Sequence, residues 1–217
     1  MRKTCDVERI KIVLKSGKEQ SLMRCHPWVF SGAIKTIFGN PAEGDIVDVY
    51  DNNDSFLGSG HYQPGSIAVR ILTFKYENID SDFFLSALER AVSFRRSIGF
   101  FSMPGLNVFR LVNAEGDNLP GLIIDWYNGV AVMQMHSVGM FRIRRMIADI
   151  LIKILGNELK AVYDKSENTI PYKSGVKPVN EYLYGSDPGI LTVSEYGHKF
   201  RIDLVSGQKT GFFIDQR

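Results

Sequence analysis

Residues 67–98 read IAVRILTFKYENIDSDFFLSALERAVSFRRSI, and this stretch changes from a strand pattern to a helix pattern. Apolar residues alternate over 67–73, as in a β-strand with one buried face. From 81 to 98 they recur every three or four positions, which is the spacing of an amphipathic helix. The predicted apolar stripe consists of Phe84, Leu88, Ala91, Phe94 and Ile98. The polar stretch 75–80 indicates a linker, so a β-rich domain precedes a domain that contains helices.

The segment before the linker is typical of a small β-barrel or sandwich. Four short strands are predicted, at 9–15, 45–50, 55–62 and 67–73. Asn and Asp at 52–54 separate two of them, and these residue types tolerate the left-handed backbone that hairpin loops require.

The segment after the linker mixes helix and strand patterns. Besides the helix at 81–98, a second helix is predicted at 141–155. Strands are predicted at 108–114, 121–126, 129–135, 160–164 and 199–205. The fold class is therefore α+β, with a small β-barrel followed by a mixed α/β domain.

The composition indicates a folded, soluble chain with little overall charge bias. Apolar residues make up 44% and charged residues 23% of the 217 residues, as in globular proteins. No apolar run approaches the ~20 residues that a membrane span needs, and no signal-peptide core is visible, so we expect a cytoplasmic protein. The net charge of +2 means that any RNA contact must come from local clustering. Such a cluster is present among the first 24 residues: basic Arg2, Lys3, Arg9, Lys11, Lys15, Lys18 and Arg24, against acidic Asp6, Glu8 and Glu19.

The last twelve residues, 206–217, read SGQKTGFFIDQR and fit neither pattern. Two adjacent phenylalanines follow a polar run, and an exposed apolar tail usually packs against something. We therefore expect that a further part of the protein belongs next to this segment.

Three stretches resemble one family. They are HPWVFSGAI at 26–34, EGDNLPGLIID at 115–125 and GQKTGFFIDQR at 207–217. All three are similar, in order and spacing, to RlmI-type enzymes, S-adenosylmethionine-dependent methyltransferases that modify a cytosine of 23S ribosomal RNA. The resemblance implies a PUA-like RNA-binding barrel at 1–75, a mixed α/β middle domain at 80–205, and a connector at 206–217. The family's Rossmann-like methyltransferase domain is expected to be absent from this chain.

The resemblance also bears on catalysis. The family's nucleophile is a cysteine of the catalytic domain, whereas Cys5 and Cys25 are expected to be inert, so no catalytic residue and no metal site is predicted here. The stretch Gly58-Ser59-Gly60 lacks the third glycine of a dinucleotide-type cofactor loop. S-adenosylmethionine is therefore expected for the full-length enzyme and not bound to this chain alone.

RNA contacts are predicted around 20–35, where a PUA-like barrel commonly approaches RNA. Arg24 and Lys35 can neutralise phosphates, and His26 can contribute a further polar contact. Trp28 has two interpretations, a platform for an unpaired base or a core residue.

Two further groups are candidates for the cleft that binds substrate and cofactor. Glu115 and Asp117 flank a turn; paired carboxylates can perform acid–base chemistry, but they also stabilise turns. In the connector, Gln208, Lys209, Thr210 and Phe212 can contact a base, a phosphate or the cofactor, or they can form a hinge with apolar anchors. The three arginines at 142, 144 and 145 are either held by an RNA or protein partner or solvated.

The expected function is the N-terminal RNA-recognition part of a ribosomal RNA cytosine methyltransferase. On this hypothesis the parent protein is an enzyme, and the 217-residue chain alone is inactive. The alternative is a stand-alone RNA-binding module, or a dimerisation module that buries Phe212 and Phe213 against a second copy.

Overall fold

A computed structural model describes residues 9–171 and 175–214. The chain divides into two compact units, Met1–Asn78 and Ile79–Arg217, each with its own apolar core. Cys5, Arg2 and Lys3 lie outside the described residues. Within the described ranges, no helix is long and apolar enough to cross a membrane.

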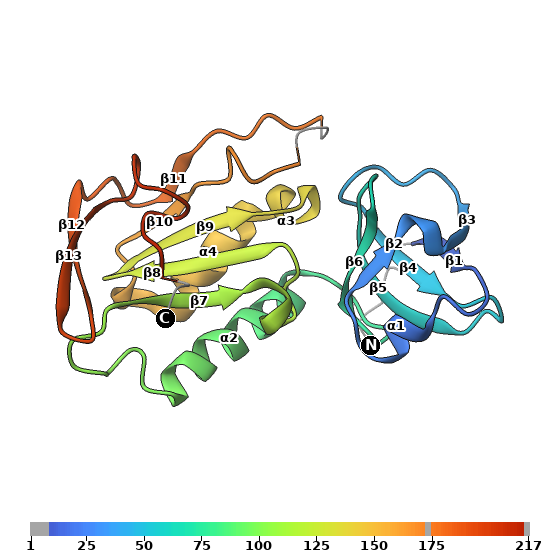
Figure 1. Cartoon of the computed structure of the whole chain (residues 1–217), viewed down its shortest axis with the longest axis horizontal. Helices are drawn as coiled ribbons and strands as arrows, with labels where there is room; N and C mark the ends of the chain where they lie inside the picture. The colour runs from blue at the N-terminus through green and yellow to red at the C-terminus, as the bar shows by residue number, and fades with distance from the viewer. Residues whose placement is uncertain (1–8, 172–174, 215–217) are drawn as a thin grey trace, which may run out of the picture. The chain divides into compact units, whose positions relative to one another are not determined.

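The first unit is built on a six-stranded sheet in the order β2-β6-β5-β4-β1-β3 (Figure 1). Its elements are β1 (Ile10–Leu14), α1 (Gln20–Met23), β2 (Trp28–Phe30), η1 (Ser31–Ala33), β3 (Ile34–Phe38), β4 (Ile46–Tyr50), β5 (Phe56–Tyr62) and β6 (Ile67–Thr73). Alternate residues of the predicted strands point inward, among them Ile12, Val47 and Ile71, and form one apolar core. The four predicted strands are confirmed. The short strands β2 and β3 are additional.

The glycines of β5 serve strand packing. A Cβ atom at Gly60 would lie 2.0 Å from the carbonyl oxygen of Arg70, and one at Gly58 would lie 2.9 Å from that of Thr73. Only glycine permits this close approach between β5 and β6. The stretch 58–60 therefore lies inside a sheet and does not fit S-adenosylmethionine.

The second unit contains a five-stranded sheet in the order β11-β10-β9-β8-β7. Its strands are β7 (Val108–Asn113), β8 (Leu122–Tyr127), β9 (Val130–Met135), β10 (Ala161–Asp164) and β11 (Glu181–Tyr184). Strands β7, β8 and β9 form an antiparallel meander, and β10 pairs parallel with β9. Helices α3 (Val138–Arg142) and α4 (Arg144–Leu155), followed by the short η3 (Gly156–Glu158), connect these two parallel strands.

This connection corrects the predicted fold class. A parallel pair with a helical crossover is the βαβ unit from which Rossmann-like sheets are built. The prediction that Rossmann-like architecture is absent from the chain is therefore wrong. The periodicity of each segment was visible in the sequence, but the parallel pairing of β9 with β10 was not.

Different elements cover the two faces of this sheet. Helix α2 (Ser81–Ser97) packs with α4 and β7, whereas the hairpin of β12 (Ile190–Glu195) and β13 (His198–Asp203) joins a core of residues from the other face (Figure 1). That core includes Tyr127, Val132 and Tyr163 of the sheet and Ile214 of the C-terminal segment. The segment 206–214 is thus packed onto the second unit.

Two helix predictions need correction in detail. In α2, Phe94 and Ile98 are exposed, and Val92 and Arg95 are buried instead. The predicted helix 141–155 is two helices, because the chain breaks at Ile143. The first of them begins after Ser137, whose hydroxyl accepts a hydrogen bond from the Met140 amide.

Candidate functional site

Three aromatic side chains follow one another along the β2 edge of the first unit. His26 and Trp28 lie edge to face with ring centroids 5.6 Å apart, and Trp28 and Phe30 do the same at 6.3 Å. Side chains at alternate positions of a strand share a face, which brings these three together. We call His26, Trp28 and Phe30 the aromatic row.

The row is exposed because Val29 takes the core position of β2. Val29 is 1% exposed, whereas Trp28 is half-buried and Phe30 is 48% exposed. The Trp28 amide donates to Nδ1 of His26 at 3.2 Å, which fixes the first ring relative to the second. Because β2 is an edge strand of the sheet, the row lies at its margin. Of the two interpretations of Trp28, the geometry favours the platform.

Cations flank the row at both ends. Arg24 is exposed and lies two residues before His26, at the end of α1. The ammonium of Lys15 donates to the carbonyl oxygen of Gly32, two residues after Phe30, at 2.9 Å. Positive groups beside exposed rings are what a single-stranded nucleic acid needs, because phosphates and bases then find partners together.

The structure does not assemble all the predicted RNA contacts in one place. Lys35 lies on β3, where its ammonium donates to Asn52 in the turn between β4 and β5. Arg9 and Lys11 form ion pairs with Asp48 and Asp54, so they add less free positive charge than their number suggests.

Phe30 was not among the predicted RNA contacts, and Lys15 was predicted only as one member of the basic cluster in the first 24 residues. The spacing of two residues between His26, Trp28 and Phe30 is the sequence signal that identifies Phe30.

Asp117 is a structural carboxylate. Its two oxygens accept from the guanidinium nitrogens of Arg95 at 2.5 and 2.7 Å, and it also accepts from the Asn113 amide. Asn118 follows with a left-handed backbone, φ 57°, as a turn at this position requires. Glu115, in the same turn, is half-buried. The contacts of Asp117 favour its turn role over acid–base chemistry.

Thr210 anchors the connector to the sheet. Its hydroxyl donates to Oδ2 of Asp125 at 2.7 Å and lies 2.7 Å from the hydroxyl of Tyr127. Asp125 is fully buried and is held from its other side by Arg110, whose Nε is 2.9 Å away. The Phe212 amide donates to the Tyr127 hydroxyl at 3.2 Å. We call Asp125, Tyr127 and Thr210 the connector clamp.

The other connector residues divide between packing and exposure. The ring of Phe212 packs on Phe200 with centroids 4.8 Å apart. Gln208 and Lys209 are exposed, and the Lys209 ammonium lies 4.5 Å from the ring centroid of Phe213. Of the predicted cleft residues here, Thr210 and Phe212 are anchors, whereas Gln208 and Lys209 face solvent.

A buried ion pair lies at the end of β10. Asp164 is fully buried, and its Oδ2 lies 3.3 Å from Nε of Arg144. Burial raises the pKa of the Asp164 carboxyl above its usual range. Arg144 and Arg145 also pair with Glu181. These two arginines are therefore held within the chain.

Cys25 and the possible metal ligands were the remaining candidates for chemistry. Cys25 is exposed in the turn after α1, with φ 59°. Within residues 9–171 and 175–214, no group of three or more His, Cys, Asp or Glu side chains is placed to hold a metal ion.

Comparison with known proteins gives the class of the first unit. Residues 12–74, which contain most of β1, all of β2 to β6 and the aromatic row, match the family model described as a PUA-like domain. The whole chain is 40% identical over 209 residues to a protein of Alteromonas mediterranea named Ribosomal RNA large subunit methyltransferase I. A protein of Shewanella denitrificans with the same name is 41% identical over 214 residues. The resemblance to RlmI-type methyltransferases is thus confirmed.

Those matches cover 95% and 96% of this chain and 52% of each relative. The chain therefore spans about half the length of the curated relatives that it matches.

Solved structures bear on the fold. The chain superimposes with a TM-score of 0.79, at 23% identity, on "a putative sam-dependent methyltransferase from Streptococcus mutans". This match covers 95% of the present chain and 52% of the other, so it includes the second unit. It supports the correction made above, because an architecture found in methyltransferase structures extends through nearly the whole chain.

Proposed function

We propose that this chain supplies RNA recognition to an S-adenosylmethionine-dependent methyltransferase of ribosomal RNA. The aromatic row carries the proposal, because it places two exposed rings and a half-buried one on an edge strand with a cation at each end. Unpaired bases stack on such rings, and phosphates bind such cations. The names of the relatives point to large-subunit ribosomal RNA as the partner. A cytoplasmic location, where ribosomes are made, belongs to the same proposal.

Phe30→Ala is expected to weaken binding of a single-stranded oligoribonucleotide by about tenfold, because stacking on one ring contributes about 1–3 kcal/mol. Fluorescence anisotropy with a labelled hexamer measures the change. Phe38→Ala is the matched control, since Phe38 is 57% exposed in the same unit but lies on β3, away from the row. Equal affinities for the two variants would place the RNA surface elsewhere.

The same titration, repeated at several salt concentrations, tests the cations. Removing one cation that binds a phosphate lowers the slope of log K against log salt by about 0.7 for a single strand. Arg24→Ala is expected to lower the slope by about this amount. A slope equal to that of the unsubstituted chain would mean that Arg24 does not bind a phosphate.

The 217-residue chain alone is expected to transfer no methyl group to ribosomal RNA. Cytosine methylation of this type uses a cysteine nucleophile, and such a thiol needs a lowered pKa or an adjacent base. Cys25 is exposed in the turn after α1, and the resemblance places the family's nucleophile on a cysteine of the catalytic domain instead. Transfer of radioactive methyl from S-adenosylmethionine to unmodified ribosomal RNA measures this. Incorporation above that of a Cys25→Ser control would contradict the prediction.

The alternative of a dimerisation module finds less support at the connector. Phe212 is packed against Phe200, and Lys209 lies over the ring of Phe213. Both rings thus already have contacts within the chain. A homodimer stays an untested prediction.

A further inference from the structure

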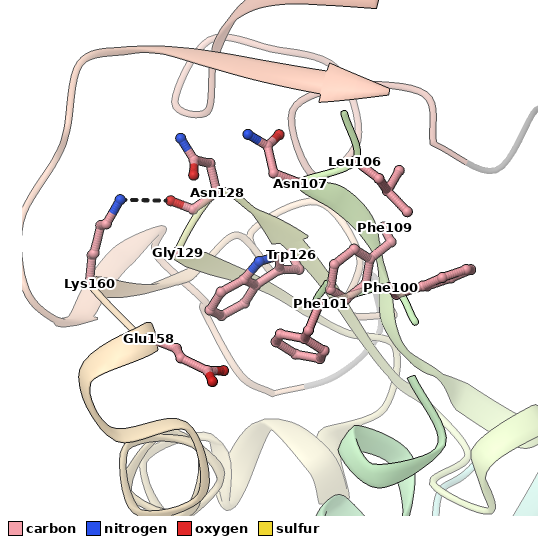
Figure 2. Close-up of a pocket in the computed structure, with 10 residues that line it drawn as sticks. All are labelled: Phe100, Phe101, Leu106, Asn107, Phe109, Trp126, Asn128, Gly129, Glu158 and Lys160. Atoms are coloured by element: carbon pink, nitrogen blue, oxygen red, sulfur yellow. Dashed lines mark hydrogen bonds between the residues drawn. The ribbon is translucent and has the colours of Figure 1, made fainter. Parts of the chain in front are cut away.

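The second unit contains a cavity that neither the aromatic row nor the connector clamp uses. Its volume is about 320 Å³, and it opens where β7 begins and β8 ends (Figure 2). This volume is within the range of small-ligand pockets, about 300–1,000 Å³. A nucleobase with part of its ribose would fill it.

One wall of the cavity is a packed set of three aromatic rings. Phe101 lies 5.1 Å from Phe109 and 5.6 Å from Trp126, and Phe109 lies 6.4 Å from Trp126, all measured between ring centroids. Phe109 is 1% and Trp126 is 6% exposed, so both are fixed by packing. Figure 2 shows all three rings together on one side of the cavity. A rigid aromatic wall binds a planar ring with little loss of side-chain entropy.

The indole N–H of Trp126 adds a polar contact. The indole N–H is a hydrogen-bond donor on a side chain that lines the cavity. Figure 2 shows the indole nitrogen on the edge of the ring nearest Asn107 and Asn128, which also line the cavity. A ligand with a hydrogen-bond acceptor on its ring edge would satisfy this donor.

The rim carries a cation, Lys160, and a carboxylate, Glu158. The ammonium of Lys160 donates to the carbonyl oxygen of Asn128 at 3.1 Å, which holds it beside the opening. The nearby carboxylate of Glu158 is paired with Arg96 at 2.9 Å. Lys160 is therefore available to a negatively charged group of the ligand.

We propose that this cavity binds an unstacked nucleobase, with the base against Phe101 and Trp126, a ring acceptor on the Trp126 indole N–H, and the phosphate beside Lys160. The proposal rests on the proposed function for the source of the base, an RNA strand. A planar ring, an edge acceptor and an adjacent anion occur together in every nucleotide.

The test follows the indole N–H resonance of Trp126 by ¹H–¹⁵N NMR in the Trp28→Phe variant, which leaves a single tryptophan. AMP added up to about 10 mM is expected to shift this resonance in a saturable way. Ribose 5-phosphate, which lacks the base, is expected to leave it unmoved. An unmoved resonance with AMP, or an equal shift with ribose 5-phosphate, would overturn the proposal.

Two variants then locate the ligand. Phe101→Leu is expected to weaken AMP binding about tenfold, whereas Phe94→Leu, an exposed phenylalanine on α2, should leave it unchanged. Lys160→Gln, at an exposed position, is expected to remove most of the salt dependence of AMP binding. Unchanged affinity in both Phe101→Leu and Lys160→Gln would place AMP outside this cavity and contradict the proposal.

The two experiments distinguish a failure of the cavity proposal from a failure of the proposed RNA recognition. If the hexamer binds through Phe30 but AMP leaves Trp126 unmoved, the cavity proposal fails and RNA recognition stands. If AMP moves Trp126 but the hexamer does not bind, RNA recognition fails and the cavity is a nucleotide site of another origin.

Discussion

Arg95→Met is expected to lower the free energy of unfolding of the second unit by about 3–5 kcal/mol, the usual cost of removing one partner from a buried ion pair. Arg95 is only 6% exposed, and its guanidinium holds both oxygens of Asp117. Its Nε also donates to the Arg110 carbonyl oxygen at 3.1 Å. Methionine fills a similar volume but leaves the Asp117 carboxylate with no cation beside it.

Urea unfolding, followed by Trp126 fluorescence in the Trp28→Phe background, measures this change. Arg96→Met is the matched control on the same helix, because Arg96 and Glu158 form an ion pair in which both side chains are about half exposed. Exposed pairs contribute about 0–1 kcal/mol. Similar losses for the two variants would mean that Asp117 is not the buried structural carboxylate assigned here, and its acid–base role would have to be considered again.

Local sequence patterns predicted the strands well, but they assigned the wrong residues to the buried face of helix α2. Alternation identified β1, β4 and β6, whose apolar residues at alternate positions form the core of the first unit. In α2, however, Phe94 was assigned to the core and is exposed, and the buried Arg95 was not part of the predicted apolar stripe. The burial of Arg95 depends on Asp117, a residue 22 positions away. No helical period contains that information.

The candidate site likewise includes residues whose roles depend on contacts between distant parts of the sequence. Arg24, His26 and Trp28 were predicted as a group because they lie close together in the sequence, within a stretch that resembles a known family. Lys15 was predicted only as one of seven clustered cations, because its position beside the aromatic row depends on the fold, through its hydrogen bond to Gly32. The roles of Thr210 and Phe212 depend on Tyr127, 83 and 85 residues away. The parallel pairing of β9 with β10 could likewise not be predicted from the sequence pattern, and it is the observation that corrects the fold class.

Thr210→Val is expected to cost about 3 kcal/mol of the free energy of unfolding. The Thr210 side chain is 2% exposed, and its hydroxyl bonds both Asp125 and Tyr127. Valine keeps the shape but leaves a buried carboxylate oxygen and a buried phenol each one hydrogen bond short. Unsatisfied buried groups cost about 1–3 kcal/mol, and charged ones more.

Urea unfolding of Thr210→Val measures the loss, and Thr192→Val is its control. Thr192 is exposed on β12 of the same unit, where such a change costs within about 0.5 kcal/mol. Hydrogen exchange of the amides in 206–214 adds a local readout, because the clamp holds this segment to the sheet. A loss of stability without faster exchange there would contradict the anchoring role.

The pH dependence of the clamp gives a second test of the same contacts. Burial raises the pKa of the Tyr127 phenol above its usual value, because the charged phenolate is disfavoured inside the protein and beside Asp125. The neutral phenol is therefore the form that stabilises the fold. Its contribution is fully present below about pH 10, the pKa of an unfolded tyrosine, and declines as the pH rises above that value. Tyr127→Phe removes this titration, so the stability advantage of the unsubstituted chain over Tyr127→Phe is expected to shrink above pH 10. A difference that stays constant across that pH range would show that Tyr127 is not buried in the clamp.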